Sequence, residues 1–208
     1  MRGTPPELFQ SASLLLRYPT PELLEADAEV ADAARRFPGA SREPLQRFLD
    51  HRSRTTPLDL EREYVETFDT RRRCTLNVGY YLYGDTRRRG VALLRLRRMY
   101  AAGGLIPDSA ELPDHLPLML EFASFAPREY GAHVLGEHRI GIELLRLALE
   151  AGDRPHADVL TAVSASLPRL GVRQRSAIVR LAAEGPPDEQ VGLEPFAPPE
   201  VMPVEARP

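Results

Sequence analysis

The chain is built from amphipathic segments with a helical period, and proline or glycine bounds most of them. After Pro57, the residues Leu60, Tyr64 and Phe68 recur every four positions, which places three large apolar side chains on one side of a helix. No stretch of four or more residues alternates convincingly with the β-branched residues that strands favour. We therefore expect an all-α fold, a single-domain bundle of about eight to ten helices joined by short turns.

Capping residues predict where these helices begin. Thr20 and Thr56 each precede a proline, with an acidic residue in the same turn, and Asp85 and Asp153 offer the same kind of capping side chain. A further helix is expected to begin at Ser41. The predicted spans include 21–37, 85–102, 114–124, 128–151 and 172–183.

Composition separates the body of the chain from its last residues. All 27 basic side chains are arginine, and the single cysteine excludes an internal disulfide or a Cys-rich zinc site. Seven of the 20 prolines fall in residues 186–208, where five acids against one arginine give a charge of -4 and leave +1 for residues 1–185. We expect an all-helical domain over 1–185 and a Pro-rich, acidic, disordered tail over 186–208.

The sequence contains no segment that would direct the chain to a membrane. The first ten residues include Pro5, Pro6 and Glu7, where a signal peptide would build its apolar stretch. No run approaches the roughly 20 apolar residues that a membrane helix needs. A cytoplasmic protein without stable membrane insertion is expected.

Catalytic and metal-binding patterns are missing from the sequence. Cys74 has no CxxC partner, His133 and Glu137 are spaced like helix-borne ligands but lack an HExxH pattern, and residues 84–90 lack the Lys-Ser/Thr of a phosphate loop. Six arginines fall between Arg87 and Arg98 with no acid nearby, which would also suit nucleic-acid binding. The near-neutral body and the absence of aromatics among these arginines favour a solvated helix face instead.

Aromatic residues and acids gather between residues 64 and 121. The aromatic residues are Tyr64, Phe68, Tyr80, Tyr81 and Tyr83. The acids that flank or follow them are Asp69, Asp85, Glu111, Asp114 and Glu121. An apolar groove edged by carboxylates would suit a peptide with apolar anchors and basic ends. The alternative is that the aromatics form core and the acids cap helices.

Four blocks of the chain stand out as motifs: LLLRYP at 14–19, YVETFD at 64–69, GDTRRRG at 84–90 and ELPDHLPLMLEF at 111–122. They resemble the NarJ family, the delta subunits or molybdenum cofactor assembly chaperones of respiratory nitrate reductase. The last three stand in the family's order and spacing, and the resemblance extends over about residues 8–185. The family belongs with the all-helical chaperones TorD and DmsD, so a TorD-like fold is implied.

The resemblance implies a chaperone, not an enzyme, and no cofactor of its own. Such a protein binds the apo form of the reductase's catalytic alpha subunit through that subunit's N-terminal segment. It holds this unfolded client for insertion of bis-molybdopterin guanine dinucleotide before membrane docking, and it would thereby serve nitrate assimilation. Cofactor-delivery proteins are further expected partners. The alternatives are a chaperone for another molybdoenzyme and an Arg-rich protein that binds nucleic acid.

The predicted functional residues fall into two groups. We expect client-peptide binding at Tyr64, Phe68, Tyr80, Tyr81, Asp85, Glu111, Asp114, His115 and Glu121. A structural role is expected for Arg87, Arg89, Gly90 and Pro113, since the two arginines could pair with the neighbouring acids. The oligomeric state stays open, as does whether the tail is inert or occupies the groove.

Overall fold

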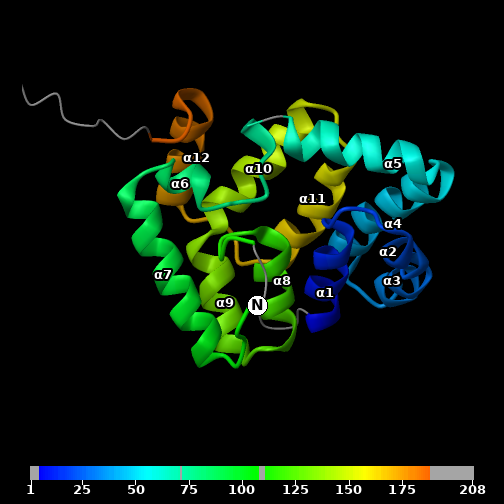
Figure 1. Cartoon of the computed structure of the whole chain (residues 1–208), viewed down its shortest axis with the longest axis horizontal. Helices are drawn as coiled ribbons and strands as arrows, with labels where there is room; N and C mark the ends of the chain where they lie inside the picture. Colours follow the sequence, from blue (N-terminus) through cyan, green and yellow to red (C-terminus); the bar gives the residue numbers. More distant parts are fainter. Residues whose placement is uncertain (1–4, 71, 108–110, 188–208) are drawn as a thin grey trace, which may run out of the picture.

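The computed structural model describes residues 5–70, 72–107 and 111–187, and within them the chain is all-α, as expected (Figure 1). No strand occurs in these ranges; the nearest approach to one is an isolated antiparallel bridge between Asn77 and His115. The helices are α1 (Pro6–Leu15), α2 (Pro21–Glu25), α3 (Asp27–Ala34), α4 (Gly39–Arg54), α5 (Pro57–Tyr64), α6 (Tyr80–Tyr83), α7 (Arg87–Ala102), α8 (Leu116–Phe125), α9 (Arg128–Glu137), α10 (Arg139–Ala151), α11 (His156–Ser166) and α12 (Val172–Glu184), with a π-helical turn at Val65–Asp69 and a 3₁₀ turn at Arg72–Cys74.

The core lies between α1 and α8 and between α4 and α11, with α9 and α10 packed against these pairs. A buried serine ties each of the two main pairs together. The hydroxyl of Ser13 on α1 donates to the carbonyl of Pro117 on α8 at 2.8 Å, and that of Ser41 on α4 donates to the carbonyl of Ala162 on α11 at 3.0 Å. The expectation that Ser41 begins a helix is therefore wrong: α4 begins at Gly39, and the Ser41 side chain bonds across the core.

The threonine caps are confirmed, whereas the aspartate caps are wrong. The hydroxyl of Thr20 accepts from the Leu23 N–H, and that of Thr56 accepts from the Asp59 N–H. In contrast, α7 begins at Arg87 and α11 at His156, and neither Asp85 nor Asp153 is the N-cap residue. The Asp85 carboxylate accepts a hydrogen bond from an arginine one turn further on, which removes it from the helix end.

Two long predicted helices are each divided in the structure. The span 128–151 breaks at His138, whose φ of -96° and ψ of 9° are not helical and whose Nδ1 lies 2.9 Å from the Val134 carbonyl. The span 21–37 divides at Ala26 into α2 and α3. No proline or paired glycine marks either place, so the apolar period runs through the breaks.

Beyond α5 the helix widens into a π turn, closed by the bond from the Thr70 N–H to the Val65 carbonyl at 3.2 Å. A π turn holds one residue more than an α turn and is frequent at functional sites. Here it buries both Tyr64 and Phe68, whose ring centroids lie 4.9 Å apart.

The C-terminal segment lies almost entirely outside the described residues. Only Pro186 and Pro187 of the predicted tail are described, so its disorder and the domain boundary at 185 stay predictions. None of the described helices has the length and apolar character that crossing a membrane requires.

Candidate functional site

The loop before α6 is hydrogen-bonded to the loop before α8, which contains the start of the sequence block at 111–122. The Val78 N–H donates to the Asp114 carbonyl at 3.0 Å, and the Leu116 N–H donates to the Leu76 carbonyl at 2.8 Å. The Tyr100 hydroxyl of α7 donates to the Pro113 carbonyl at 2.6 Å and holds the same loop from the other side. The loop before α8 is therefore held by backbone hydrogen bonds and by the Tyr100 hydroxyl, and not by a helix cap.

Arg89 joins the block at 84–90 to this loop. Its guanidinium donates to both carboxylate oxygens of Asp114, from Nε at 2.9 Å and from Nη2 at 3.3 Å, and from Nη1 to Asp85 at 3.0 Å. The side chain of Asp114 is 1% exposed and that of Arg89 is 12% exposed, so the pair is buried. The guanidinium carbon also lies 5.8 Å from the ring centroid of Tyr80. This bidentate pair fixes the start of α7 against the loop.

Gly79 is needed where Asp114 packs against the chain. A Cβ at this position would lie 2.5 Å from Oδ2 of Asp114 and 3.2 Å from its Cβ. We expect Gly79→Ala to lower the free energy of unfolding by about 1 to 3 kcal/mol, because the buried carboxylate has no room to move away from Arg89. Urea denaturation measures this change. Gly136→Ala is the matched control, since its Cβ would meet nothing within 4 Å, and equal losses in both variants would contradict the proposed crowding.

Most of the predicted aromatic residues lie in the core. Tyr64, Phe68 and Tyr81 are buried, and the Tyr81 hydroxyl donates towards the carbonyls of Arg73 and Thr75 at 2.9 and 3.1 Å. Burial, with smaller effects from the charges of Asp69 and Glu111, raises the pKa of Tyr64 far above its ordinary value. The rings of Tyr64, Phe68 and Tyr81 therefore lie beneath the molecular surface and contribute little to it.

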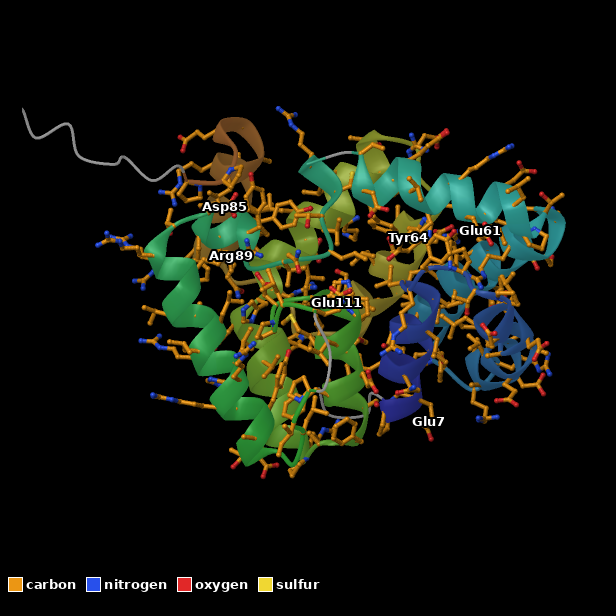
Figure 2. All side chains as sticks on the ribbon, viewed as in Figure 1. Glu7, Glu61, Tyr64, Asp85, Arg89 and Glu111 are labelled. Atoms are coloured by element: carbon orange, nitrogen blue, oxygen red, sulfur yellow. The ribbon has the colours of Figure 1, made fainter. Side chains whose placement is uncertain are left out.

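The surface over the buried Tyr64 ring carries acidic residues. Tyr18, 40% exposed after α1, packs edge to face on Tyr64 with ring centroids 5.4 Å apart. Desolvation, then the nearby carboxylates of Glu61 and Asp69, raise the pKa of Tyr18. The charges of Asp69 and Glu111 likewise raise the pKa of Tyr64, the ring on which Tyr18 packs. We call Tyr18, Glu61, Asp69 and Glu111 the acidic face; Figure 2 labels two of its acids with Tyr64.

One edge of the acidic face is a mixed-charge cluster. Glu121 forms an ion pair with Arg17, and Glu111 lies 3.9 Å from Nδ1 of His115. Burial lowers the pKa of His115, and the charge of Arg17 adds to this, while the charges of Glu111 and Asp114 oppose it. The lowered pKa of His115 reduces the positive charge that this ring offers to Glu111.

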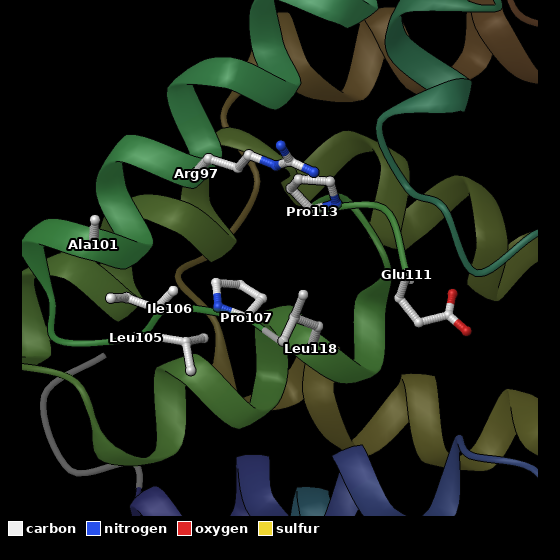
Figure 3. A pocket seen from close by; sticks show the side chains of 8 residues that line it. All are labelled: Arg97, Ala101, Leu105, Ile106, Pro107, Glu111, Pro113 and Leu118. Atoms are coloured by element: carbon white, nitrogen blue, oxygen red, sulfur yellow. The ribbon is translucent and has the colours of Figure 1, made fainter. Parts of the chain in front are cut away.

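A cavity of about 270 Å³ adjoins the acidic face (Figure 3). Its apolar lining is made by Leu105, Ile106, Pro107 and Leu118. Arg97 and Glu111 also border the cavity, and the Glu111 carboxylate points away from the other labelled side chains (Figure 3). Ile106 is 87% exposed, so this lining is accessible to a partner. Glu111 therefore belongs both to the cavity and to the acidic face.

The structure brings together only part of the predicted client-binding set. Glu111, His115 and Glu121 lie at the acidic face, and Tyr64 lies beneath it. Asp85 lies beside Arg89 at the start of α7, away from Glu111 and Glu61 (Figure 2). Asp114 is buried and held by Arg89, so in this conformation it cannot reach a ligand. Tyr80 is half-buried near Arg89, and Phe68 and Tyr81 are in the core. Client contact by these residues stays a prediction.

The predicted structural residues differ in their surroundings. Arg89 and Pro113 take part in the fixed loop before α8. Arg87 is exposed, and Gly90 is exposed with open space where a Cβ would lie. The structure therefore gives no packing reason for glycine at position 90.

Sequence reasoning missed three contributors to the site. Tyr18 belongs to the block at 14–19, but its pairing with Tyr64 is a long-range contact. Glu61 lies three residues before Tyr64, outside the block at 64–69, and Ile106 follows the glycine pair that ends α7. Of these, only Tyr18 carried a sequence signal.

The side chains at this site suit the binding of a partner. Among the described residues, no group of three His, Cys, Asp or Glu side chains is placed to hold a metal ion. His133 and Glu137 form an exposed ion pair at 3.4 Å. Carboxylates, an exposed tyrosine and an apolar cavity are the features that bind a basic peptide with apolar side chains.

Comparison with known proteins gives a family and consistent relatives. The model of the family "Nitrate reductase delta subunit" matches residues 34–162. The chain is 35% identical over 170 residues to the "Probable nitrate reductase molybdenum cofactor assembly chaperone NarJ" of Bacillus subtilis, covering 80% of this chain and 91% of that protein. It is 32% identical over 148 residues to the "Nitrate reductase molybdenum cofactor assembly chaperone NarJ" of Escherichia coli K12, covering 70% and 63%.

A third relative is a longer protein. The "Nitrate reductase-like protein NarX" of Mycobacterium tuberculosis is 35% identical over 156 residues, which are 75% of this chain but 24% of NarX. The family model covers more than half of the chain, and the Bacillus relative is matched over nearly its whole length. The chain therefore belongs to the nitrate reductase delta subunit family.

Proposed function

We propose that this chain is an assembly chaperone for a respiratory nitrate reductase, which binds the N-terminal segment of the catalytic alpha subunit in the cytoplasm. It holds this apo subunit open for insertion of the molybdenum cofactor and delays membrane docking until insertion is complete. The chain carries no cofactor itself; bis-molybdopterin guanine dinucleotide belongs to the client. Membership in the family and the names of the two NarJ relatives support the chaperone role. The family is one of assembly chaperones and not of catalysts, which confirms the prediction that the chain is not an enzyme.

The observation that carries the peptide-binding part of the proposal is the position of Glu111. Its side chain borders the apolar cavity, and its negative charge raises the pKa of Tyr64, which lies beneath the acidic face. A client segment can therefore place an apolar side chain among Leu105, Ile106 and Leu118 while its basic residues lie against carboxylates. Tyr18 adds an exposed ring on which an arginine can stack.

Calorimetric titration of the full chain with a synthetic peptide of the alpha subunit's N-terminal segment tests this function. We expect saturable binding that weakens as salt is raised, because exposed carboxylates contribute through screened charges. Glu111→Gln should weaken the affinity about 5- to 10-fold, roughly 1 to 1.4 kcal/mol.

Glu129→Gln is the matched control, since Glu129 is an exposed acid on α9 without an ion pair among the described residues. The control should bind the peptide like the unmodified chain. Equal losses in the two variants would contradict the assignment of the site, whereas absence of binding by the unmodified chain would contradict the proposed client contact.

A further inference from the structure

The outer face of α7 is basic and apolar, and no described residue covers it. Leu96 and Tyr100 point into the core, whereas Val91 and Leu94 on the other side are 54% and 59% exposed. Exposed arginines flank these two at helical spacing: Arg88, Arg95 and Arg98. Nitrogen-tipped side chains project from this edge of α7 into solvent (Figure 2). We call Arg88, Val91, Leu94, Arg95 and Arg98 the outer face of α7.

The positive charge of this face is not balanced locally. Residues 86–107 contain six arginines and no acid, and of these arginines Arg89 is used in the buried pair with Asp114. Arg88, Arg95 and Arg98 form no ion pair with any residue that the structure describes. Like charges along one helix face repel one another. An acidic partner would remove this repulsion and also cover the exposed valine and leucine.

The described chain ends beside the start of this helix. Beyond α12, the carbonyl of Pro187 is in such close contact with Gly84 that a Cβ there would overlap it. Gly84 has a φ of 59°, which glycine adopts readily, and it stands three residues before α7 begins. Pro187, the last described residue, therefore lies near the N-terminal end of the basic helix.

The segment that follows has the complementary composition. Residues 188–208 contain five acids, Asp188, Glu189, Glu194, Glu200 and Glu205, against the single basic residue Arg207. Apolar side chains alternate with them, among them Leu193 and Phe196. A helix of 16 residues is about 24 Å long, a distance that about eight extended residues span, so the 21 residues available exceed what the face requires.

We propose that residues 188–208 bind back along the outer face of α7. The acids lie against Arg88, Arg95 and Arg98, and the apolar residues cover Val91 and Leu94. The segment then shields this arginine-rich surface from nucleic acid and other anionic surfaces, and it leaves the acidic face open to a client.

Paramagnetic relaxation enhancement in the full chain tests this contact. A nitroxide is attached at Val204→Cys in a Cys74→Ser background, and amide signals are compared before and after reduction of the label. We expect at least twofold weakening of the Val91, Leu94 and Arg95 signals at low salt, and recovery at about 0.5 M salt, where the Debye length falls to a few ångströms. No weakening at low salt would overturn the proposal.

Charge variants separate this contact from a nonspecific one. Arg88→Gln/Arg95→Gln/Arg98→Gln should abolish the effect, whereas Arg42→Gln/Arg54→Gln/Arg128→Gln, with the same change of net charge elsewhere, should retain it. Equal effects in the two triple variants would overturn the proposal. A mixture of labelled and isotope-enriched chains tests for a second copy, and weakening only between chains would also overturn it.

Hydrogen–deuterium exchange provides a readout without a label. In the full chain, replacing the five acids of 188–208 with their amides should speed exchange at the α7 amides about 3- to 10-fold and leave α11 unchanged. Unchanged exchange at α7 would count against the contact.

Discussion

Replacing Arg89 with methionine is expected to lower the free energy of unfolding by about 3 to 5 kcal/mol, a large share of the stability of a typical domain. Methionine fills much of the same volume but leaves the Asp114 carboxylate, 1% exposed, without its bidentate partner. A buried charge without a partner costs far more than the pair gains, so the loss exceeds what the hydrogen bonds alone would suggest. Urea denaturation with two-state fitting measures the change.

Three further variants isolate the cause. Asp114→Asn alone should cost less, because the amide oxygen still accepts one hydrogen bond from Arg89 and the Arg89 charge keeps Asp85 as a partner. The double variant Arg89→Met/Asp114→Asn should be more stable than Arg89→Met, since the second change removes the unpaired charge. Arg54→Met on the exposed end of α4 controls for loss of a surface arginine and should stay within about 0.5 kcal/mol. A loss below about 1 kcal/mol for Arg89→Met would contradict a buried charge pair at this position.

The chain should lose stability as the pH falls below 6.5, and His156 should account for much of the loss. Its ring is 4% exposed and packs between Phe48 and Phe68, with centroids at 4.9 and 4.8 Å. Burial lowers the pKa of His156 to about 3, and the charges of Arg52, His51 and Arg154 add to this. Its Nδ1 and the Glu63 Oε1, 3.8 Å apart, have no hydrogen-bond partner among the described residues.

The sign follows from where the proton binds. Between pH 3 and 6.5 the unfolded chain protonates this histidine and the folded chain does not, so unfolding takes up a proton and becomes easier as the pH falls. The stability is fully present above pH 6.5 and is lost progressively below it, by about 2 kcal/mol between pH 7 and pH 5. His115 and His138, whose pKa values are also lowered by burial, add losses of the same sign.

His156→Phe and His156→Gln test this assignment by comparing urea midpoints at pH 7 and pH 5. Each variant should show a pH dependence smaller by about 2 kcal/mol than the unmodified chain, whatever its stability at pH 7. His133→Gln is the control, because that ring is exposed on α9 and its surroundings change little on unfolding. The same pH dependence in all four proteins would contradict a buried, neutral His156.

The sequence predicted where helices occur more accurately than the residues at which they begin and end. Apolar period and threonine-proline starts are local signals, and α2, α5 and α8 follow them. The aspartate starts failed for two reasons. Asp85 bonds Arg89, and no local rule shows that a carboxylate has a stronger partner than a helix end. Asp153 has a φ of 51° and lies two residues before Pro155, the N-cap of α11. The break at His138 likewise coincides with a contact between the His138 ring and the Val134 carbonyl rather than with a breaker residue.

The site was only partly predictable for a related reason. Glu111 was identified because it begins a recognisable block, and the structure places it at both the cavity and the acidic face. The pairing of Tyr18 with Tyr64 spans 46 positions and has no local signature. Burial, which separates Asp114 from Glu111 although they are three residues apart, is a property of the packed molecule.

The π turn at Val65–Asp69 makes the acidic face sensitive to the number of residues and not only to their identity. Deleting one residue would let the turn close as ordinary α-helix, and each residue of an α-helix turns the chain by about 100°. Asp69 would then rotate away from Tyr18 even though every site side chain were still present. In relatives of this chain, a gap of one position between Tyr64 and Asp69 therefore signals a different surface, whereas exchanges within the turn at unchanged length preserve it.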